Sequence, residues 1–212
     1  MPYIDTHSHI YSKEFEIDID NVIKNAINSG VEKIILPSID KSHFDSMISL
    51  SNKYSNMLFP LIGVHPSSIS NDYKPEIDFV EEELTKNKYI GIGEIGIDLY
   101  WDKTFLTQQT EVFEKQLQLA VKYNLPVVIH QRESFNEIFE VIDKSEFSSL
   151  RGIFHCYSGN LATAKKCIDK GFLLGIGGVV TYKKSLMADV VKDISLDYLV
   201  LETDAPYLPP VP

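Results

Sequence analysis

Short apolar runs alternate with segments of helical spacing along the whole chain of 212 residues. Between the runs, apolar side chains recur three and four residues apart, as in Phe113, Leu117, Ala120 and Val121, which indicates amphipathic helices. The runs themselves are short and rich in β-branched residues, which is typical of buried strands. They predict eight strands, at Tyr3–Thr6, Lys33–Leu36, Leu58–Val64, Ile90–Glu94, Val127–His130, Gly152–His155, Leu173–Ile176 and Tyr198–Thr203.

Strict alternation of strand and helix predicts a parallel sheet, either doubly wound or closed into a TIM (β/α)₈ barrel. Eight units favour the barrel. The polar residues support it too, because they follow many different strands, whereas a doubly wound sheet gathers them at one switch point. No linker or repeat interrupts the pattern, so residues 1–212 are interpreted as a single domain.

The last nine residues predict an irregular end to the barrel. Four of them are proline, which prevents an eighth helix after the last strand. A complete TIM barrel typically has about 250 residues and covers each strand with a helix. We therefore expect a barrel without its final helix, truncated at the C-terminus, with Ile4, Leu199 and Leu201 exposed in a groove that favours self-association.

Histidines and acids gather where the predicted strands end. His7 and His9 are two residues apart on one strand, so both side chains project from the same face. Four of the histidines together with two acids are more ligands than one catalytic zinc requires. Imidazoles and carboxylates are ligands for zinc, manganese and similar ions. It indicates two divalent ions that share a carboxylate and hydrolyse an ester. The residues at strand ends are His7, His9, His65, Glu94, His130, His155 and Asp204.

Six segments resemble the TatD-like metal-dependent deoxyribonucleases, which belong to the amidohydrolase superfamily. They span Tyr3 to Pro210 in the family's order and read HSH, GVHP, GEIGID-x-YW, H-x-RE, FHCYSG and ETDAPYLPP. The resemblance implies a TIM barrel with two divalent ions, such as zinc, manganese or magnesium. It implies one ion held by His7, His9, Glu94 and Asp204, and a second held by Glu94, His130 and His155.

The resemblance also implies roles in catalysis and substrate binding. Glu94 would bridge the two ions, Asp204 would orient or deprotonate the attacking water, and His65 would contact the substrate. The chain departs from the family at Leu99, where a second aromatic residue is frequent, and at Ser67, where a histidine is frequent. Both positions are in predicted loops, so these departures concern substrate preference.

Further loop residues are candidates for substrate contacts. Arg132 could bind a phosphate or pair with the adjacent Glu133, and both readings stay open. Tyr157 and Ser158 precede a predicted helix, whose N-terminus can hold an anion. Aromatic residues suited to stacking bases are Tyr100, Trp101 and Tyr207. Cys156, next to His155 on a predicted strand, should point away from the site and pack.

The charge and the amino-acid composition of the chain limit which functions and locations are expected. The net charge of −10 argues against a broad DNA-binding surface, although acids around bound cations are neutralised. Two cysteines, no secretory signal and no apolar run of about 18 residues favour a cytoplasmic protein without a membrane or obligate protein partner. DNA or another nucleic acid is the expected substrate.

Other functions remain open on the same residues. A related hydrolase could cleave a small ester or lactone, or an aminoacyl-tRNA ester, at the same metal site. Many such relatives bridge their metals with a carboxylated lysine, whereas the fourth predicted strand carries Glu94 and no lysine, which favours the nuclease. A non-catalytic metal-stabilised scaffold is a third reading. Gly91–Gly96 matches a dinucleotide-binding pattern, but no helix is predicted directly after it, which favours a buried strand.

Overall fold

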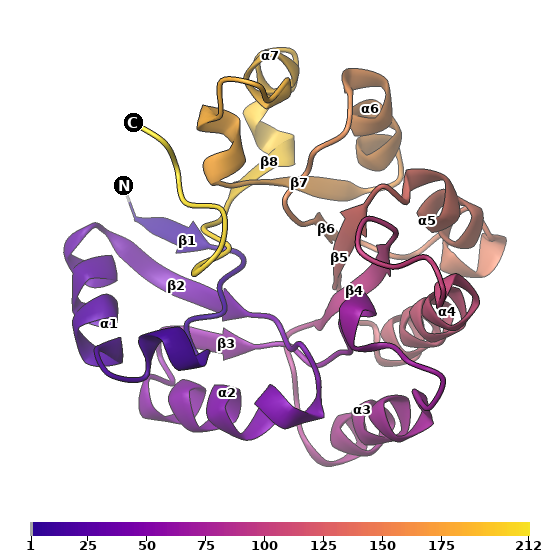
Figure 1. Ribbon diagram of the computed structural model, residues 1–212, viewed down its shortest axis with the longest axis horizontal. Coiled ribbons are helices and arrows are strands. Elements are labelled where there is room, and N and C mark those ends of the chain that lie inside the picture. The colour runs from indigo at the N-terminus through magenta and orange to yellow at the C-terminus, as the bar shows by residue number, and fades with distance from the viewer. Residues whose placement is uncertain (1) are drawn as a thin grey trace.

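The computed structural model describes residues 2–212, which form an eight-stranded barrel surrounded by helices (Figure 1). All eight predicted strands are confirmed, most within two residues at each end. The strands are β1 (Tyr3–Asp5), β2 (Val31–Leu36), β3 (Leu58–Pro60), β4 (Ile92–Asp98), β5 (Val127–Arg132), β6 (Gly152–Phe154), β7 (Phe172–Ile176) and β8 (Leu199–Leu201). The α-helices are α1 (Ile19–Asn28), α2 (Lys41–Lys53), α3 (Lys74–Lys86), α4 (Leu106–Tyr123), α5 (Phe135–Ile142), α6 (Leu161–Asp169) and α7 (Met187–Lys192).

All neighbouring strands are parallel, in the orders β1-β2-β3 and β4-β5-β6-β7-β8. A few backbone contacts on each side join these two groups. On one side Ile62 forms a bridge with Ile92, and the amide of Gly93 donates to the carbonyl of Ile62 at 2.9 Å. On the other side the amide of Thr6 donates to the carbonyl of Leu201 at 3.0 Å. The sheet is therefore closed, as the order of elements predicts.

The seam between β8 and β1 is held by a buried carboxylate. Asp5 accepts from the amide of Thr203 at 3.0 Å, from its hydroxyl at 2.6 Å and from the amide of His7 at 3.2 Å. Beyond it, the amide of Asp204 donates to the carbonyl of His7 at 2.9 Å. These bonds fix the first and last strand ends side by side, which places His7 next to Asp204.

β4 is the most deeply buried strand, because every one of its residues is buried. Its glycines allow close packing, since a Cβ on Gly93 would come within 2.8 Å of the Val128 Cβ. Gly91–Gly96 therefore leads into and lies in a strand and is not a dinucleotide-binding loop, as predicted. On the outer side of the barrel, α4 buries Phe113 and Leu117, whose helical spacing the sequence shows.

No α-helix follows β8 in the part of the chain that the structure describes (Figure 1). The proline-rich segment instead contacts the loop after β7, where the Tyr182 hydroxyl donates to the Pro209 carbonyl at 3.0 Å. Ile4 and Leu201 are 48% and 55% exposed, as expected for outward residues without a covering helix, whereas Leu199 is half-buried. Among the described residues, no helix is long and apolar enough to cross a membrane.

Candidate metal centre

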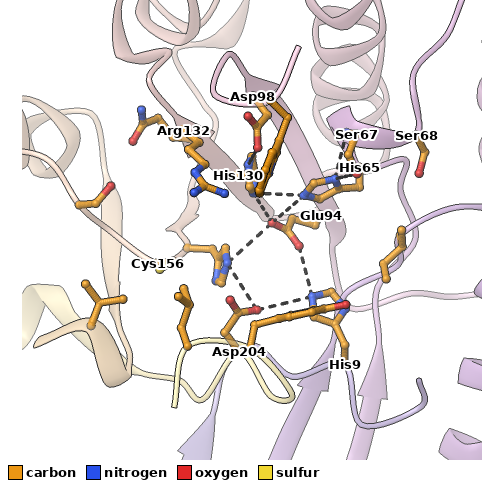
Figure 2. A pocket seen from close by; sticks show the side chains of 18 of the residues that line it. His9, His65, Ser67, Ser68, Glu94, Asp98, His130, Arg132, Cys156 and Asp204 are labelled. Carbon is orange, nitrogen blue, oxygen red and sulfur yellow. Dashed lines mark hydrogen bonds and ion pairs between the residues drawn. The ribbon is translucent and has the colours of Figure 1, made fainter. Parts of the chain in front are cut away.

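Side chains in or just after five strands converge in one buried cluster at the mouth of the barrel (Figure 2). Parallel strands in a closed barrel end at the same rim, so residues far apart in sequence meet there. The structure brings together all six residues expected to bind metal. They are His7, His9, Glu94, His130, His155 and Asp204.

Glu94 lies at the centre, and its two oxygens face different groups of imidazoles. Its Oε2 is 3.0 Å from the Nε2 of His7 and 3.5 Å from the Nε2 of His9. Its Oε1 is 2.7 Å from the Nδ1 of His130 and 3.7 Å from the Nε2 of His155. This arrangement suits a carboxylate that is shared between two cations.

Asp204 faces the cluster from the end of β8. Its Oδ1 lies 3.7–3.8 Å from the Nε2 atoms of His7, His9 and His155. The His7 and His155 rings are stacked with centroids 3.4 Å apart, so His155 lies closer to His7 than to His130, at 6.4 Å. The expected second group, Glu94 with His130 and His155, is therefore spread more widely than the first.

His65 was expected only to contact substrate, but its ring lies against the cluster itself. Its Nε2 is 3.4 Å from Oε1 of Glu94 and 3.2 Å from Nδ1 of His130. The Nδ1 atom, however, accepts from the amide of Ser67 at 3.0 Å, so a neutral ring carries its hydrogen on Nε2. The hydrogen bonding therefore makes Nε2 of a neutral His65 a donor, although His65, Glu94 and His130 also place ligand atoms close enough together to share a cation.

The charges of the cluster depend on burial and on close partners. Burial alone would raise the pKa of Glu94, but the charges of His7, His65 and His155 hold it well below its usual range. Burial and the charge of His155 lower the pKa of His7. Burial opposes the charged form of His155, yet the carboxylates of Glu202 and Glu94 raise its pKa to about 10. An ionised carboxylate surrounded by imidazoles fits a site for cations.

The donor set agrees with divalent metal ions. His7 Nε2 and His9 Nε2 are only 3.1 Å apart and face the same Glu94 oxygen, so both nitrogens can bind one cation. The Tyr11 hydroxyl donates to the Pro37 carbonyl at 2.6 Å and lies 2.9 Å from Nδ1 of His9. It therefore accepts the Nδ1 hydrogen and leaves the Nε2 lone pair facing Glu94.

Sequence reasoning missed the outer partners of the cluster. Tyr11, Asp98 and Glu202 each contact the ring nitrogen of a histidine that faces away from Glu94. Glu202 is buried against Gly175, where a Cβ would come within 2.2 Å of its Oε2. Asp98 and Glu202 could have been found, because each ends or follows an apolar run, whereas Tyr11 carries no such signal.

The cluster forms the floor of a cavity of about 940 Å³, lined among others by His65, Trp101, Arg132, Ser158 and Tyr207. The Arg132 guanidinium lies 3.7 Å from the centroid of the Tyr100 ring, which lies beside Trp101. Among the described residues, the Arg132 side chain has no ion pair and no hydrogen bond, so the pair with Glu133 does not form. Its N–H groups are available to an anion.

Two expectations for the loop after β6 are wrong. Tyr157 is buried, packs against Phe135 and donates its hydroxyl to the Asn160 carbonyl at 2.6 Å, so it is no substrate contact. Cys156 lines the cavity and does not point away from it, because β6 ends at Phe154 and Cys156 has a φ of +42°. The rule of alternating side chains therefore does not apply there.

A barrel with histidines and carboxylates at its strand ends defines the class of metal-dependent hydrolases. Within that class, the family model described as TatD related DNase matches residues 4–212, and the chain belongs to this family.

Relatives agree with this family. The uncharacterized metal-dependent hydrolase YabD of Bacillus subtilis is 32% identical over 98% of this chain and 82% of its own length. The crystal structure of YjjV, a TatD homolog from Escherichia coli, is similar with a TM-score of 0.92 and 30% identity, over 99% of this chain and 81% of that one. A TatD family hydrolase from Entamoeba histolytica has a TM-score of 0.84 and 26% identity, over 98% and 75%. These likenesses establish a metal-dependent hydrolase on a TIM barrel.

Proposed function

We propose that the chain is a deoxyribonuclease that hydrolyses phosphodiester bonds with two divalent cations. The observation that carries the proposal is the position of Glu94, whose oxygens face separate groups of imidazoles on the floor of a cavity that also holds Arg132. The family description as DNase supports the choice of substrate. The net charge of −10 restricts binding to the surroundings of the cations.

The residues that would hold the first cation are His7, His9, Glu94 and Asp204, and those for the second are Glu94, His130 and His155. Zinc, manganese and magnesium all accept ligands from this set. Bound there, two divalent ions would acidify a water molecule and neutralise charge on a phosphodiester.

The chain's own groups would position the substrate and move the proton. Asp204 would accept the proton of the attacking water, because its carboxylate lines the cavity and faces the same imidazoles as Glu94. His65 would donate from Nε2 to a phosphate oxygen, since Ser67 fixes the hydrogen on that nitrogen. Ser158 lines the same cavity and would contact the substrate next to Arg132.

Arg132 would anchor a phosphate. The ring of Tyr100 covers one face of its guanidinium and holds it over the cavity, which leaves the N–H edges for a bidentate contact. Trp101, which is 74% exposed at the rim, offers a surface on which a base can stack.

A second candidate is hydrolysis of an uncharged ester or lactone, or of an aminoacyl-tRNA ester. The apolar part of the cavity wall, formed by Ile39, Val179 and Leu208, favours it. Arg132 distinguishes the two, because a small uncharged ester gains nothing from a free guanidinium.

The test uses end-labelled single-stranded and double-stranded DNA with metal-reconstituted protein, with and without chelator. We expect cleavage that chelator abolishes. Glu94→Ala should lose both metals, because the shared ligand is removed, whereas Asp204→Asn should keep much of the metal and lose turnover. Metal content and rate are measured on the same samples. Equal metal loss in both variants would reduce Asp204 to a ligand, and intact DNA beside a hydrolysed ester would favour the second candidate.

A further inference from the structure

The histidines of the cluster do not all turn the same nitrogen inward. His9 and His155 face Glu94 with Nε2, and their Nδ1 atoms lie 2.9 Å from the Tyr11 hydroxyl and 3.1 Å from Glu202. His130 is reversed. Its Nδ1 lies 2.7 Å from Oε1 of Glu94, and its Nε2 lies 3.0 Å from Oδ2 of Asp98. Each ring nitrogen of His130 therefore has a carboxylate beside it (Figure 2).

We propose that Asp98 is the positioning residue that keeps the ring hydrogen of His130 on Nε2, so that Nδ1 offers its lone pair to a divalent cation beside Glu94. The inference rests on the proposed metal centre. A neutral imidazole has one N–H group and one lone pair, and a carboxylate only accepts. Glu94 and Asp98 therefore compete for one hydrogen. If Glu94 received it from Nδ1, the hydrogen would occupy the position that the cation needs.

The fold holds the Asp98 carboxylate rigidly in this role. Asp98 is the last residue of β4 and only 5% exposed. Its Oδ1 accepts from the amide of Tyr100 at 2.9 Å, which leaves Oδ2 for His130. The buried Gln109 of α4 clamps the same residue, since it accepts from the Asp98 amide at 2.8 Å and donates to the Asp98 carbonyl at 3.3 Å.

His65 supports the same hydrogen position independently. Because Ser67 donates to Nδ1 of His65, the Nε2 atom of a neutral His65 carries a hydrogen, and it lies 3.2 Å from Nδ1 of His130. A donor so close to Nδ1 of His130 favours a lone pair on that atom. Asp98 and His65, on opposite sides of the ring, therefore favour the hydrogen on Nε2, and Glu94 competes with them when no cation is bound.

The decisive variant is Asp98→Asn. The Tyr100 amide still needs an acceptor, so the side-chain oxygen stays with it and the new NH₂ group faces Nε2 of His130. Nε2 must then accept, and the hydrogen moves to Nδ1, toward Glu94. An analogous change of Asp to Asn beside the histidine of a serine protease triad leaves the geometry intact and stabilises the wrong tautomer.

Asp98→Ala removes the acceptor without adding a donor, so the proposal expects a smaller loss than for asparagine. A purely structural role predicts the opposite order, because alanine loses the bonds to both Tyr100 and His130 and asparagine keeps the one to Tyr100. Asp102→Asn is the matched control, since Asp102 is an exposed acid in the same loop that accepts from the amide of Thr104.

The measurements are calorimetric titration of chelator-treated protein with Zn²⁺ and ¹⁵N NMR of the histidine rings with one and with two Zn²⁺ ions bound. For wild type and Asp102→Asn we expect two Zn²⁺ ions, with His130 bound through Nδ1 and protonated on Nε2. For Asp98→Asn we expect affinity for one of the two ions to fall about 10–100-fold, and in the protein that has bound only the other ion we expect hydrogen on Nδ1 of His130. The Asp98→Ala variant should lie in between.

Several results would overturn the proposal. They are a larger loss for alanine than for asparagine, unchanged Zn²⁺ affinity in both variants, or an Nε2 hydrogen on His130 in the asparagine protein. If Asp98→Asn does not fold, the test rests on Asp98→Ala. The proposal is then overturned if Asp98→Ala has the Zn²⁺ affinity and the His130 tautomer of wild type. The proposed nuclease activity is tested separately. A protein that binds two Zn²⁺ ions but leaves DNA intact would contradict that activity, and the Zn²⁺ titrations would still decide the role of Asp98. Wild type that binds no Zn²⁺ overturns both.

Discussion

Replacing Asp5 with alanine should open the seam that joins the first and last strands. The buried carboxylate accepts three hydrogen bonds, from the amides of His7 and Thr203 and from the Thr203 hydroxyl. The Thr6 hydroxyl adds one bond across the same strands, to the Leu201 carbonyl at 3.0 Å. We therefore expect Asp5→Ala to lower stability and to separate His7 from Asp204.

The magnitude follows from the hydrogen bonds that the variant loses. Three buried bonds, at about 1 kcal/mol each after exchange with water, give a loss of about 3 kcal/mol at neutral pH. That loss lowers Tm by roughly 10 °C in a domain of this size. Burial also raises the pKa of Asp5 to about 6 from the model-compound value of 3.8, and because this shift already contains the hydrogen bonds, it enters only the pH dependence.

The same pKa predicts the direction of the pH dependence. A carboxyl whose pKa is raised on folding stabilises the protein at low pH, and this contribution is lost as pH rises from about 4 to about 6. Asp5→Ala lacks the contribution. The difference in stability between wild type and variant should therefore be larger at about pH 4.5 than at about pH 7.5, by about 2 kcal/mol.

Urea denaturation of chelator-treated protein at the two pH values measures both quantities, with Asp72→Ala, an exposed acid, as the control. A free energy of unfolding within about 0.5 kcal/mol of wild type for Asp5→Ala would show that the seam does not depend on this carboxylate. A stability difference that grows with pH would refute the argument from its pKa.

Two further predictions follow from single contacts. In Gly152→Ala the new Cβ would lie 1.9 Å from the Val127 carbonyl oxygen, so β5 and β6 must separate and we expect a loss of about 2 kcal/mol or more. Urea unfolding beside the exposed control Ser148→Ala checks this, and equal stability would contradict the close packing. Arg132→Lys keeps the charge but loses the planar contact with Tyr100, so KM for DNA should rise nearly as much as in Arg132→Ala. A lysine variant with wild-type KM would show that charge alone suffices.

Much of the fold can be predicted from the sequence, because its signals are local. Eight β-branched runs and the helical spacing between them define the order of elements, and that order leaves few parallel architectures. The candidate site follows from the same order. In a closed parallel sheet all carboxyl ends reach one rim, so His7, Glu94, His130 and Asp204 must approach one another wherever they stand in the chain.

Local patterns misled the interpretation where the backbone leaves regular structure. The alternation of side chains along a strand predicts that Cys156, next to His155, points away from the site. Its positive φ instead turns the thiol toward the cavity. Tyr157 stands in a loop that resembles an anion site, yet its ring fills space beside Phe135. Burial of this kind depends on what other elements bring to the same place.

The sequence by itself determined where the strands lie and which polar residues stand in or just after them, since hydrophobic periodicity acts over a few residues, although β4 ends at Asp98 and not at Glu94. Only the tertiary structure decided how each side chain is held. The carboxylate of Asp5 meets Thr203 across nearly the whole chain, and Asp98 contacts His130 from the neighbouring strand. For His130, which can present either nitrogen, the choice of the one that faces Glu94 depends on this distant acceptor. His9 differs, because its partner Tyr11 lies only two residues along the chain.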